Sequence, residues 1–164
     1  MIILGIDPGL AIVGYGVIEY KGNKYKALDY GIITTDADLL FPQRLKNIYD
    51  DLSSLIDKYN PDDIGIEELF FNKNVKTTIK VGQARGVEIL AAINKGIEIY
   101  EYTPLQIKQS VAGYGRADKK QVQEMVKLLL NLNEIPKPDD AADALAVAIC
   151  HSSCLKFKDM FKMK

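Results

Sequence analysis

The sequence contains no tryptophan, and only two cysteines and one histidine occur among its 164 residues. Cys150 and Cys154 lie four residues apart, which places them on one face of a helix if this segment is helical. Without further cysteines, and with His151 as the one histidine, a zinc site is not expected. We instead expect buried, reduced thiols, which are typical of a cytoplasmic protein.

Long hydrophobic runs are also missing. No apolar segment approaches the roughly 20 residues that a membrane-spanning helix needs. The first residues, MIILGID, have neither a basic region nor a cleavage site, so we expect no signal peptide. Hydrophobic residues make up 48% of the chain and charged residues 26%, which predicts a soluble globular protein of one domain.

The net charge of −1 conceals an uneven distribution along the chain. Residues 1–70 hold 6 Lys and Arg against 12 Asp and Glu, whereas residues 71–164 hold 15 against 10. The two halves therefore carry −6 and +5. This pattern is compatible with an acidic metal pocket beside a surface that faces a polyanion.

The first third of the sequence predicts three strands. Met1–Asp7 is apolar up to its last residue, and Ala11–Tyr20 and Lys24–Thr35 are rich in Val, Ile, Tyr and Thr. Lys21, Gly22 and Asn23 form a tight turn between the second and third strands. We therefore expect an antiparallel meander.

The rest of the chain predicts helices that alternate with two further strands, Asp63–Leu69 and Ile97–Tyr102. Helices are expected at about 42–59, 77–94, 104–111, 119–130 and 139–155. This order indicates an α/β domain over residues 1–155 with a mixed five-stranded sheet flanked by helices. Residues 156–164 are expected to form a loose basic C-terminal tail.

Two of the expected helices contain informative residues. Gly82 and Gly86 lie four apart in one helix, and each costs about 1 kcal/mol against alanine. The close approach of another backbone or helix would justify them. Asp118, with Gln121 three residues later, predicts a capping box at the start of another helix.

Four carboxylates occupy positions that would converge in such a fold. Asp7 and Glu67 end two apolar strands, where an unpaired acid is costly to bury. Asp140 and Asp143 are three apart, so both project from one helix face. The surrounding alanines would let this helix lie close to the sheet. If it crosses the ends of the two strands, all four acids meet.

Clustered carboxylates repel one another, and divalent cations resolve that conflict. An oxygen-rich site suits Mg²⁺ or Mn²⁺, and two such ions can promote phosphodiester hydrolysis. Simpler interpretations remain open. Asp139 or Asp140 could merely favour the helix dipole, and Asp7 in DPG could merely form a turn.

The motifs taken together resemble the RuvC family of bacterial Holliday-junction resolvases. The resemblance covers roughly residues 1–152 and is carried, in family order and spacing, by MIILGIDPGLAIVGYGVI, GIEELFFNKN, VGQARGVEILAA, YTPLQIKQSVAGYGRADKKQVQ and DAADALAVAICH. It implies a ribonuclease H-like fold, a homodimer, and Mg²⁺-dependent cleavage of four-way DNA junctions with two ions per site, for which Mn²⁺ would substitute. It also implies cooperation with the RuvA–RuvB branch-migration complex.

The resemblance assigns roles to individual residues. The family's catalytic and metal-binding acids match Asp7, Glu67, Asp140 and Asp143, although some relatives have histidine at the position of Asp140. Its two DNA-contacting lysines match Lys108 and Lys119, and the phenylalanine that reaches the junction centre matches Phe70.

Basic side chains elsewhere predict a wider DNA-binding surface, because lysine and arginine neutralise phosphates and release counterions. The candidates besides Lys108 and Lys119 are Lys76, Lys80, Arg85, Arg116 and Lys120, with Lys73 as a further basic residue. A solvated charged face is the alternative for each of them, and core or dimer packing is the alternative for Phe70 and Phe71.

Parts of the sequence also fit three other functions. The GIDPG start also occurs in actin-like phosphotransferases, but these need a second phosphate loop for which 164 residues leave no room. A non-catalytic junction-binding protein would not need the acids. A related nuclease that acts on RNA or RNA–DNA hybrids would need a substrate comparison to be distinguished.

Overall fold

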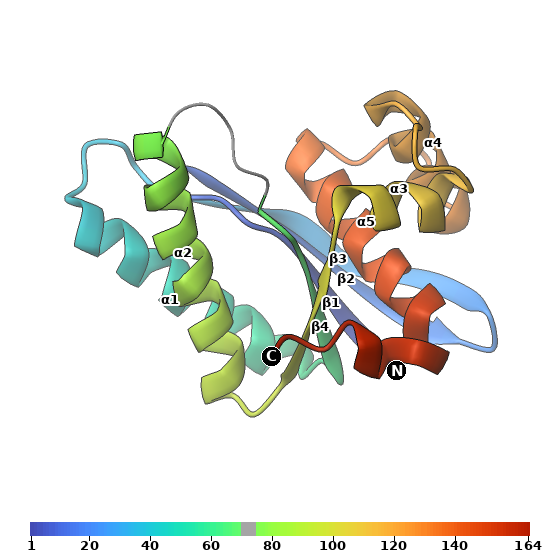
Figure 1. Ribbon diagram of the computed structural model, residues 1–164, viewed down its shortest axis with the longest axis horizontal. Helices are drawn as coiled ribbons and strands as arrows, with labels where there is room; N and C mark the ends of the chain where they lie inside the picture. Colours follow the sequence, from blue (N-terminus) through green and yellow to red (C-terminus); the bar gives the residue numbers. More distant parts are fainter. Residues whose placement is uncertain (70–74) are drawn as a thin grey trace.

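The computed structural model describes residues 1–69 and 75–164, with side chains for 1–69 and 77–164 (Figure 1). Five strands form one sheet in the order β3-β2-β1-β4-β5. Their bounds are β1 Ile2–Asp7, β2 Ile12–Lys21, β3 Lys24–Thr34, β4 Asp63–Glu67 and β5 Glu98–Tyr102. The first three strands are antiparallel, while β1, β4 and β5 run parallel. The predicted mixed sheet is confirmed.

The predicted meander owes its geometry to the turn between β2 and β3. Gly22 and Asn23 both have positive φ, at 56° and 61°. Such a turn matches the right-handed twist of the flanking strands, so β2 and β3 stay paired up to the turn. Along its other edge, β2 pairs with β1, and Gly14 lies directly opposite Asp7.

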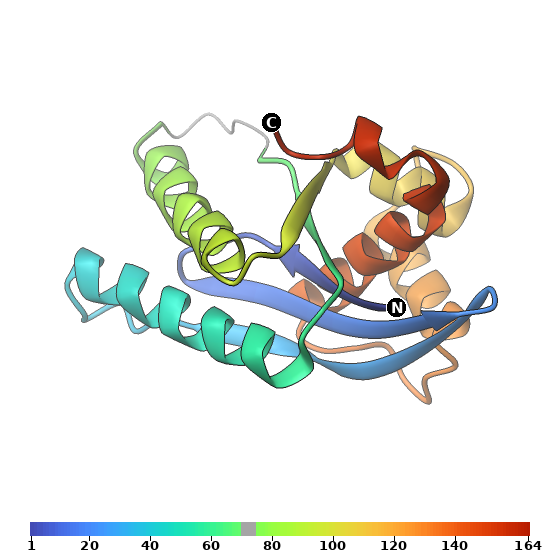
Figure 2. The same ribbon diagram turned by 90° about the horizontal axis from the view of Figure 1, so that it is seen from below.

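Helices cover both faces of the sheet (Figures 1 and 2). One face carries α1 Phe41–Tyr59 and α2 Val75–Asn94, and the other carries α3 Pro104–Ala112, α4 Lys119–Leu129 and α5 Asp139–Cys154. Because alternate side chains of a strand point to opposite faces of the sheet, one strand contributes residues to both hydrophobic cores. Leu4 and Ile6 of β1 belong to the core beneath α1 and α2, whereas Ile3 belongs to the core beneath α5. No helix among the described residues has the length and apolar character needed to cross a membrane.

Close packing of α5 on the sheet depends on glycines as well as on alanines. A Cβ at Gly5 would lie 2.1 Å from the Ala144 carbonyl oxygen, and one at Gly14 would lie 2.1 Å from the Asp140 carbonyl oxygen. A Cβ at Gly16 would lie 2.8 Å from the side chain of Leu145. The helix backbone therefore rests directly on β1 and β2, where no larger residue would fit.

The glycines of α2 differ from this arrangement. A Cβ at Gly82 or Gly86 would have no atom within 4 Å among the described residues. The expected close approach of another backbone is therefore not made within the described part of this chain. These glycines leave an open strip on the outer side of the helix.

The C-terminal tail is not loose, contrary to the prediction. A short 3₁₀ helix, η1 Leu155–Met160, is followed by backbone hydrogen bonds from Glu101 to Phe161 and from Met163 to Ile99, which dock the tail on the edge of β5. The Lys158 ammonium lies 2.7 Å from the buried Asp63 carboxylate. Its charge compensates an acid that would otherwise be costly to bury, so the tail has a defined place in the fold.

Candidate active site

The two strand-end acids meet at one edge of the sheet. Because β1 and β4 are parallel neighbours, their last residues, Asp7 and Glu67, lie side by side. Strand alternation points both side chains to the face covered by α5, since Ile6 and Ile66 just before them belong to the opposite core. The start of α5 crosses this edge, with Asp140 above Gly14, the residue opposite Asp7. The predicted convergence of acids is therefore present.

Crowding of the acids shifts their protonation. Burial and the nearby Glu67, Asp143 and Asp140 raise the pKa of Asp7 to about 8. Burial and Asp143 raise the pKa of Glu67 to about 6, against a hydrogen bond with Asp7 that lowers it. At neutral pH the Asp7 carboxyl therefore keeps a proton, which it can donate to Glu67. This proton lowers the net negative charge of the acid cluster and so reduces the repulsion between its members.

Lys119 supplies positive charge at the same site. Its ammonium lies 3.0 Å from the Asp143 carboxylate and 3.3 Å from that of Asp139. The predicted capping box, with Asp118 and Gln121 exchanging hydrogen bonds, fixes the start of α4 and so the position of Lys119. Burial raises the pKa of Asp143, although Lys119 opposes the shift.

The donor set fits a hard divalent cation. Its atoms are carboxylate oxygens, the ligands that Mg²⁺ and Mn²⁺ prefer. The raised pKa of Asp7 reflects burial first and then repulsion by the neighbouring acids, and a cation would offset both. In the described residues, however, no three acidic, histidine or cysteine side chains are gathered into a ligand shell. In this structure the carboxylate of Asp143 is held in an ion pair with the Lys119 ammonium. Asp139 pairs with Lys119 as well and is exposed.

A small pocket of about 200 Å³ opens beside the acids. Glu67, Asp143, Lys108 and Lys119 all line it, and they come from β4, α5, α3 and α4. The capping box of Thr103 and Gln106 starts α3 and so places Lys108 at the pocket. Both lysines that the resemblance singled out therefore flank the carboxylates. An anionic group such as a phosphate would meet cations and acids together here.

The other predicted DNA-binding residues are not all at this site. Arg116 and Lys120 are exposed near the start of α4, and the exposed Lys80 lies over the ring of Phe41 on the other side of the sheet. Arg85 is nearly buried and its guanidinium pairs with Glu101. Phe70, Phe71 and Lys73 lie outside the described residues, as does the side chain of Lys76.

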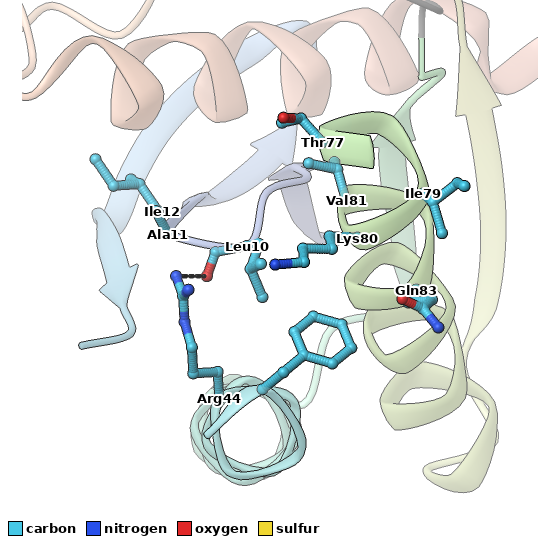
Figure 3. Close-up of a pocket in the computed structure, with 10 residues that line it drawn as sticks. Leu10, Ala11, Ile12, Arg44, Thr77, Ile79, Lys80, Val81 and Gln83 are labelled. Atoms are coloured by element: carbon cyan, nitrogen blue, oxygen red, sulfur yellow. Dashed lines mark hydrogen bonds between the residues drawn. The ribbon is translucent and has the colours of Figure 1, made fainter. Parts of the chain in front are cut away.

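A wider apolar pocket of about 880 Å³ lies between α1, α2 and the segment after β1 (Figure 3). Arg44 and Lys80 point into it, but none of the four clustered acids lines it. Its size alone therefore does not make it the reaction site, because the groups that can perform chemistry are at the smaller pocket.

Sequence reasoning did not find two buried polar features. His151 bridges Tyr102 and Asp63, at 2.8 Å and 3.0 Å, so the one histidine is a structural core residue. Glu88 is fully buried on α2 and accepts a hydrogen bond from the backbone of Gly9. A glutamate within an apolar helix stripe was the available signal for Glu88, but only the fold shows its partner.

The raised pKa values predict that the metal-free protein loses stability in alkali. Unfolded Asp7 releases its proton near 3.8 and folded Asp7 near 8, so between these values the folded state holds more protons. Stability must fall as pH rises through that range. Between about pH 6.5 and 8.5 we expect Asp7 alone to cost on the order of 2 kcal/mol, or about 5 °C in melting temperature, in a chelator.

The measurement is a melting curve at each pH, for the wild-type chain and for Asp7→Asn. Glu88 contributes in the same direction, because burial raises its pKa to about 8. Asp7→Asn should therefore reduce the pH dependence by roughly half rather than remove it. An unchanged slope in Asp7→Asn would contradict the assignment of the shift to Asp7.

The chain is similar in sequence and structure to known proteins. The family model described as crossover junction endodeoxyribonuclease RuvC matches residues 3–151. Curated proteins of that name from Alkaliphilus oremlandii and Finegoldia magna are 65% and 63% identical over the full length of both chains. A structure titled "T. thermophilus RuvC in complex with Holliday junction substrate" superposes with a TM-score of 0.91 at 30% identity, covering 99% of this chain and all of the other. The predicted ribonuclease H-like fold is confirmed.

Proposed function

The chain belongs to the RuvC family of crossover junction endodeoxyribonucleases, and we propose that it resolves Holliday junctions by paired symmetric nicks during recombination and repair. The observation that supports this most directly is the pocket in which Glu67 and Asp143 face Lys108 and Lys119. Acids that can hold cations and lysines that can hold a phosphate are what phosphodiester hydrolysis requires.

Asp7, Glu67, Asp140 and Asp143 would hold Mg²⁺, with Mn²⁺ as a substitute. Two ions bound there would supply Lewis acidity to the phosphodiester and lower the pKa of a water molecule. The chain itself orients the phosphate through Lys108 and Lys119, which line the same pocket. Lys119 can exchange its contact with Asp143 for a phosphate oxygen, since its side chain is half exposed. We expect products with a 5′-phosphate and a free 3′-hydroxyl.

The DNA would extend from this pocket over the start of α4. Arg116 and Lys120 are exposed there, next to Lys119. Lys80 of α2 would contact DNA as well. Phe70 and Lys76 stay predicted DNA contacts, and their side chains lie outside the described residues. Arg85 is left out of this surface because of its ion pair with Glu101. Each phosphate contact makes binding weaker in salt.

A homodimer through α2 would give the two cuts their symmetry. Ile79, Leu90 and Ile93 are 57%, 51% and 56% exposed, and with Gly82 and Gly86 they recur at helical spacing. An apolar stripe with glycines at its centre suits a second helix that crosses closely. A two-fold axis there places identical sites on opposed strands of a junction. We further propose that the dimer works in the cytoplasm with the RuvA–RuvB complex.

The dimer proposal predicts that Leu90→Lys yields a monomer. A charge inside an apolar interface stays unpaired on association, so we expect the dissociation constant to rise at least about 100-fold. Sedimentation velocity over a concentration series measures it. Leu128→Lys is the matched control, because Leu128 is 69% exposed on α4, outside the stripe. Equal dissociation of both variants would argue against an α2 interface.

The proposed substrate is tested with a synthetic four-way junction in Mg²⁺, beside a linear duplex and an RNA–DNA hybrid of the same sequence. We expect symmetric nicks in the junction and at least about 100-fold slower cutting of the other two, because only the junction presents two related strands to the dimer. Junction binding without cutting in Mg²⁺ or Mn²⁺ would leave a binding protein. Preferential cutting of the hybrid would overturn the substrate.

A further inference from the structure

Glu88 is a buried acid that the proposed reaction does not use. It lies on the inner side of α2 among the buried alanines Ala84, Ala91 and Ala92, and its side chain is fully enclosed. One of its oxygens, Oε2, has no hydrogen-bond partner among the described residues. Burying a carboxyl group with incomplete pairing costs stability, so its presence in an apolar layer needs a reason.

The other oxygen points to the loop that follows Asp7. Glu88 Oε1 accepts a hydrogen bond from the backbone N–H of Gly9 at 3.4 Å. That loop turns so tightly that a Cβ on Gly9 would lie 1.9 Å from the Ile12 carbonyl oxygen. The strand hydrogen bonds of β1 end at Asp7, and the Ala11 carbonyl oxygen accepts one from the Thr35 N–H. The backbone groups between them need partners on other segments.

A second contact holds the same loop from the side of α1. Thr35 Oγ1 donates a hydrogen bond to the Leu10 carbonyl oxygen at 2.5 Å and accepts one from Arg44 Nε at 2.9 Å. Arg44 Nη2 also reaches the Leu10 carbonyl at 3.5 Å, the bond drawn in Figure 3. Hydrogen bonds to the N–H of Gly9 and to the C=O of Leu10 therefore hold residues 8–11 in place.

We infer that Glu88 and Thr35 are positioning residues for Asp7, because their hydrogen bonds hold residues 8–11, the loop that directly follows Asp7. The inference rests on the proposed nuclease function, in which Asp7 is a cation ligand. Asp7 is the last residue of its strand, so its carboxylate can shift if the loop beyond it shifts. Displacement of a reacting or ligand group by about 1 Å costs on the order of 100-fold in rate.

Packing gives a competing explanation that makes the opposite prediction. If Glu88 only filled space, an apolar residue of similar volume would serve better, since it would remove the penalty of an incompletely paired carboxyl. Burial raises the pKa of Glu88 to about 8, so at neutral pH the group is an uncharged acceptor. Glutamine reproduces that acceptor and leucine does not. The two substitutions therefore separate holding the loop from filling the core.

The test compares Glu88→Leu with Glu88→Gln in steady-state cleavage of the four-way junction. We expect Glu88→Leu to melt at the same or a higher temperature while kcat falls about 10- to 100-fold and KM for the junction stays unchanged. Glu88→Gln should keep kcat within about 3-fold. Thr35→Val, which removes one hydroxyl from a residue only 7% exposed, should lower kcat in the same way from the other side of the loop.

A cation titration without DNA supplies a second readout. Free Mn²⁺ is followed by its electron paramagnetic resonance signal, and we expect Glu88→Leu to bind it about 10-fold more weakly than Glu88→Gln does. Wild-type activity and Mn²⁺ affinity in both Glu88→Leu and Thr35→Val would overturn the inference. A wild-type chain that cuts no junction would instead overturn the proposed function, so the two failures can be told apart.

Discussion

Replacing Asp143 by asparagine is expected to lower junction cleavage by a factor on the order of 1,000 or more, while junction binding stays intact. Asp143 lines the pocket with Glu67 and both lysines, and an amide cannot supply the charge that a divalent cation requires. The measurement is single-turnover cleavage of the four-way junction in Mg²⁺, with binding followed in Ca²⁺.

The matched control is Asp139→Asn on the same helix. Asp139 also pairs with Lys119, but it is exposed at the first turn of α5. We expect its cleavage rate to stay within about 5-fold of wild type, since Asp139 does not line the pocket that Glu67 and Asp143 share. More than a tenth of wild-type activity in Asp143→Asn, or an equal loss in Asp139→Asn, would argue against the assigned site.

Asp143→Asn should not weaken the fold. Burial raises the pKa of Asp143, and its charge also raises the pKa values of Asp7 and Glu67. Removing the charge relieves this repulsion, whereas the contact with Lys119 loses part of its strength. We therefore expect a melting temperature in chelator that is equal to or above that of the wild type. Active sites commonly trade stability for function in this way.

The second large effect is expected for Gly14→Ala. A methyl group there would lie 2.1 Å from the carbonyl oxygen of Asp140, which is backbone and cannot move aside cheaply. The start of α5 must shift away from β2. We expect a loss of about 3 kcal/mol in unfolding free energy and, because Asp140 and Asp143 move with the helix, a cleavage rate reduced about 100-fold.

Gly115→Ala is the control for this substitution. Its added methyl group would lie 2.3 Å from Cδ1 and 3.2 Å from Cγ of Leu105, a side chain that is 60% exposed and can rotate away, and at an ordinary contact distance of 3.7 Å from the Leu105 carbonyl oxygen. We expect a stability change within about 0.5 kcal/mol and full activity. Chemical denaturation with a linear extrapolation measures both variants. A Gly14→Ala protein as stable as Gly115→Ala would contradict the described packing of α5.

The sequence by itself determined the elements and the acids. Period-two and helical apolar patterns predicted five strands and the helices, and turn and capping residues such as Gly22 and Asp118 predicted their ends. These patterns are local, so they can be interpreted without the fold. The positions of Asp7 and Glu67 at strand ends, with Asp143 on an alanine-rich helix, were enough to predict that acids converge.

Only the tertiary structure decided which partner each charged or small residue meets. Arg85 was predicted to contact DNA from its charge, but the packing of α2 against β5 pairs it with Glu101. The tail was predicted to be loose from its composition, but Lys158 compensates the buried Asp63. Composition shows what a side chain can bind, whereas the fold decides what lies within reach.

The glycines show the same division most clearly. In the sequence, Gly14 and Gly82 each interrupt a pattern of larger residues, and a close approach was predicted for Gly82. In the folded chain, Gly14 supports the backbone of α5, while Gly82 faces open space on the described chain. The physical reason is that a missing Cβ is a local property, but the atom that takes its place comes from a distant segment, and only three-dimensional packing brings that segment near.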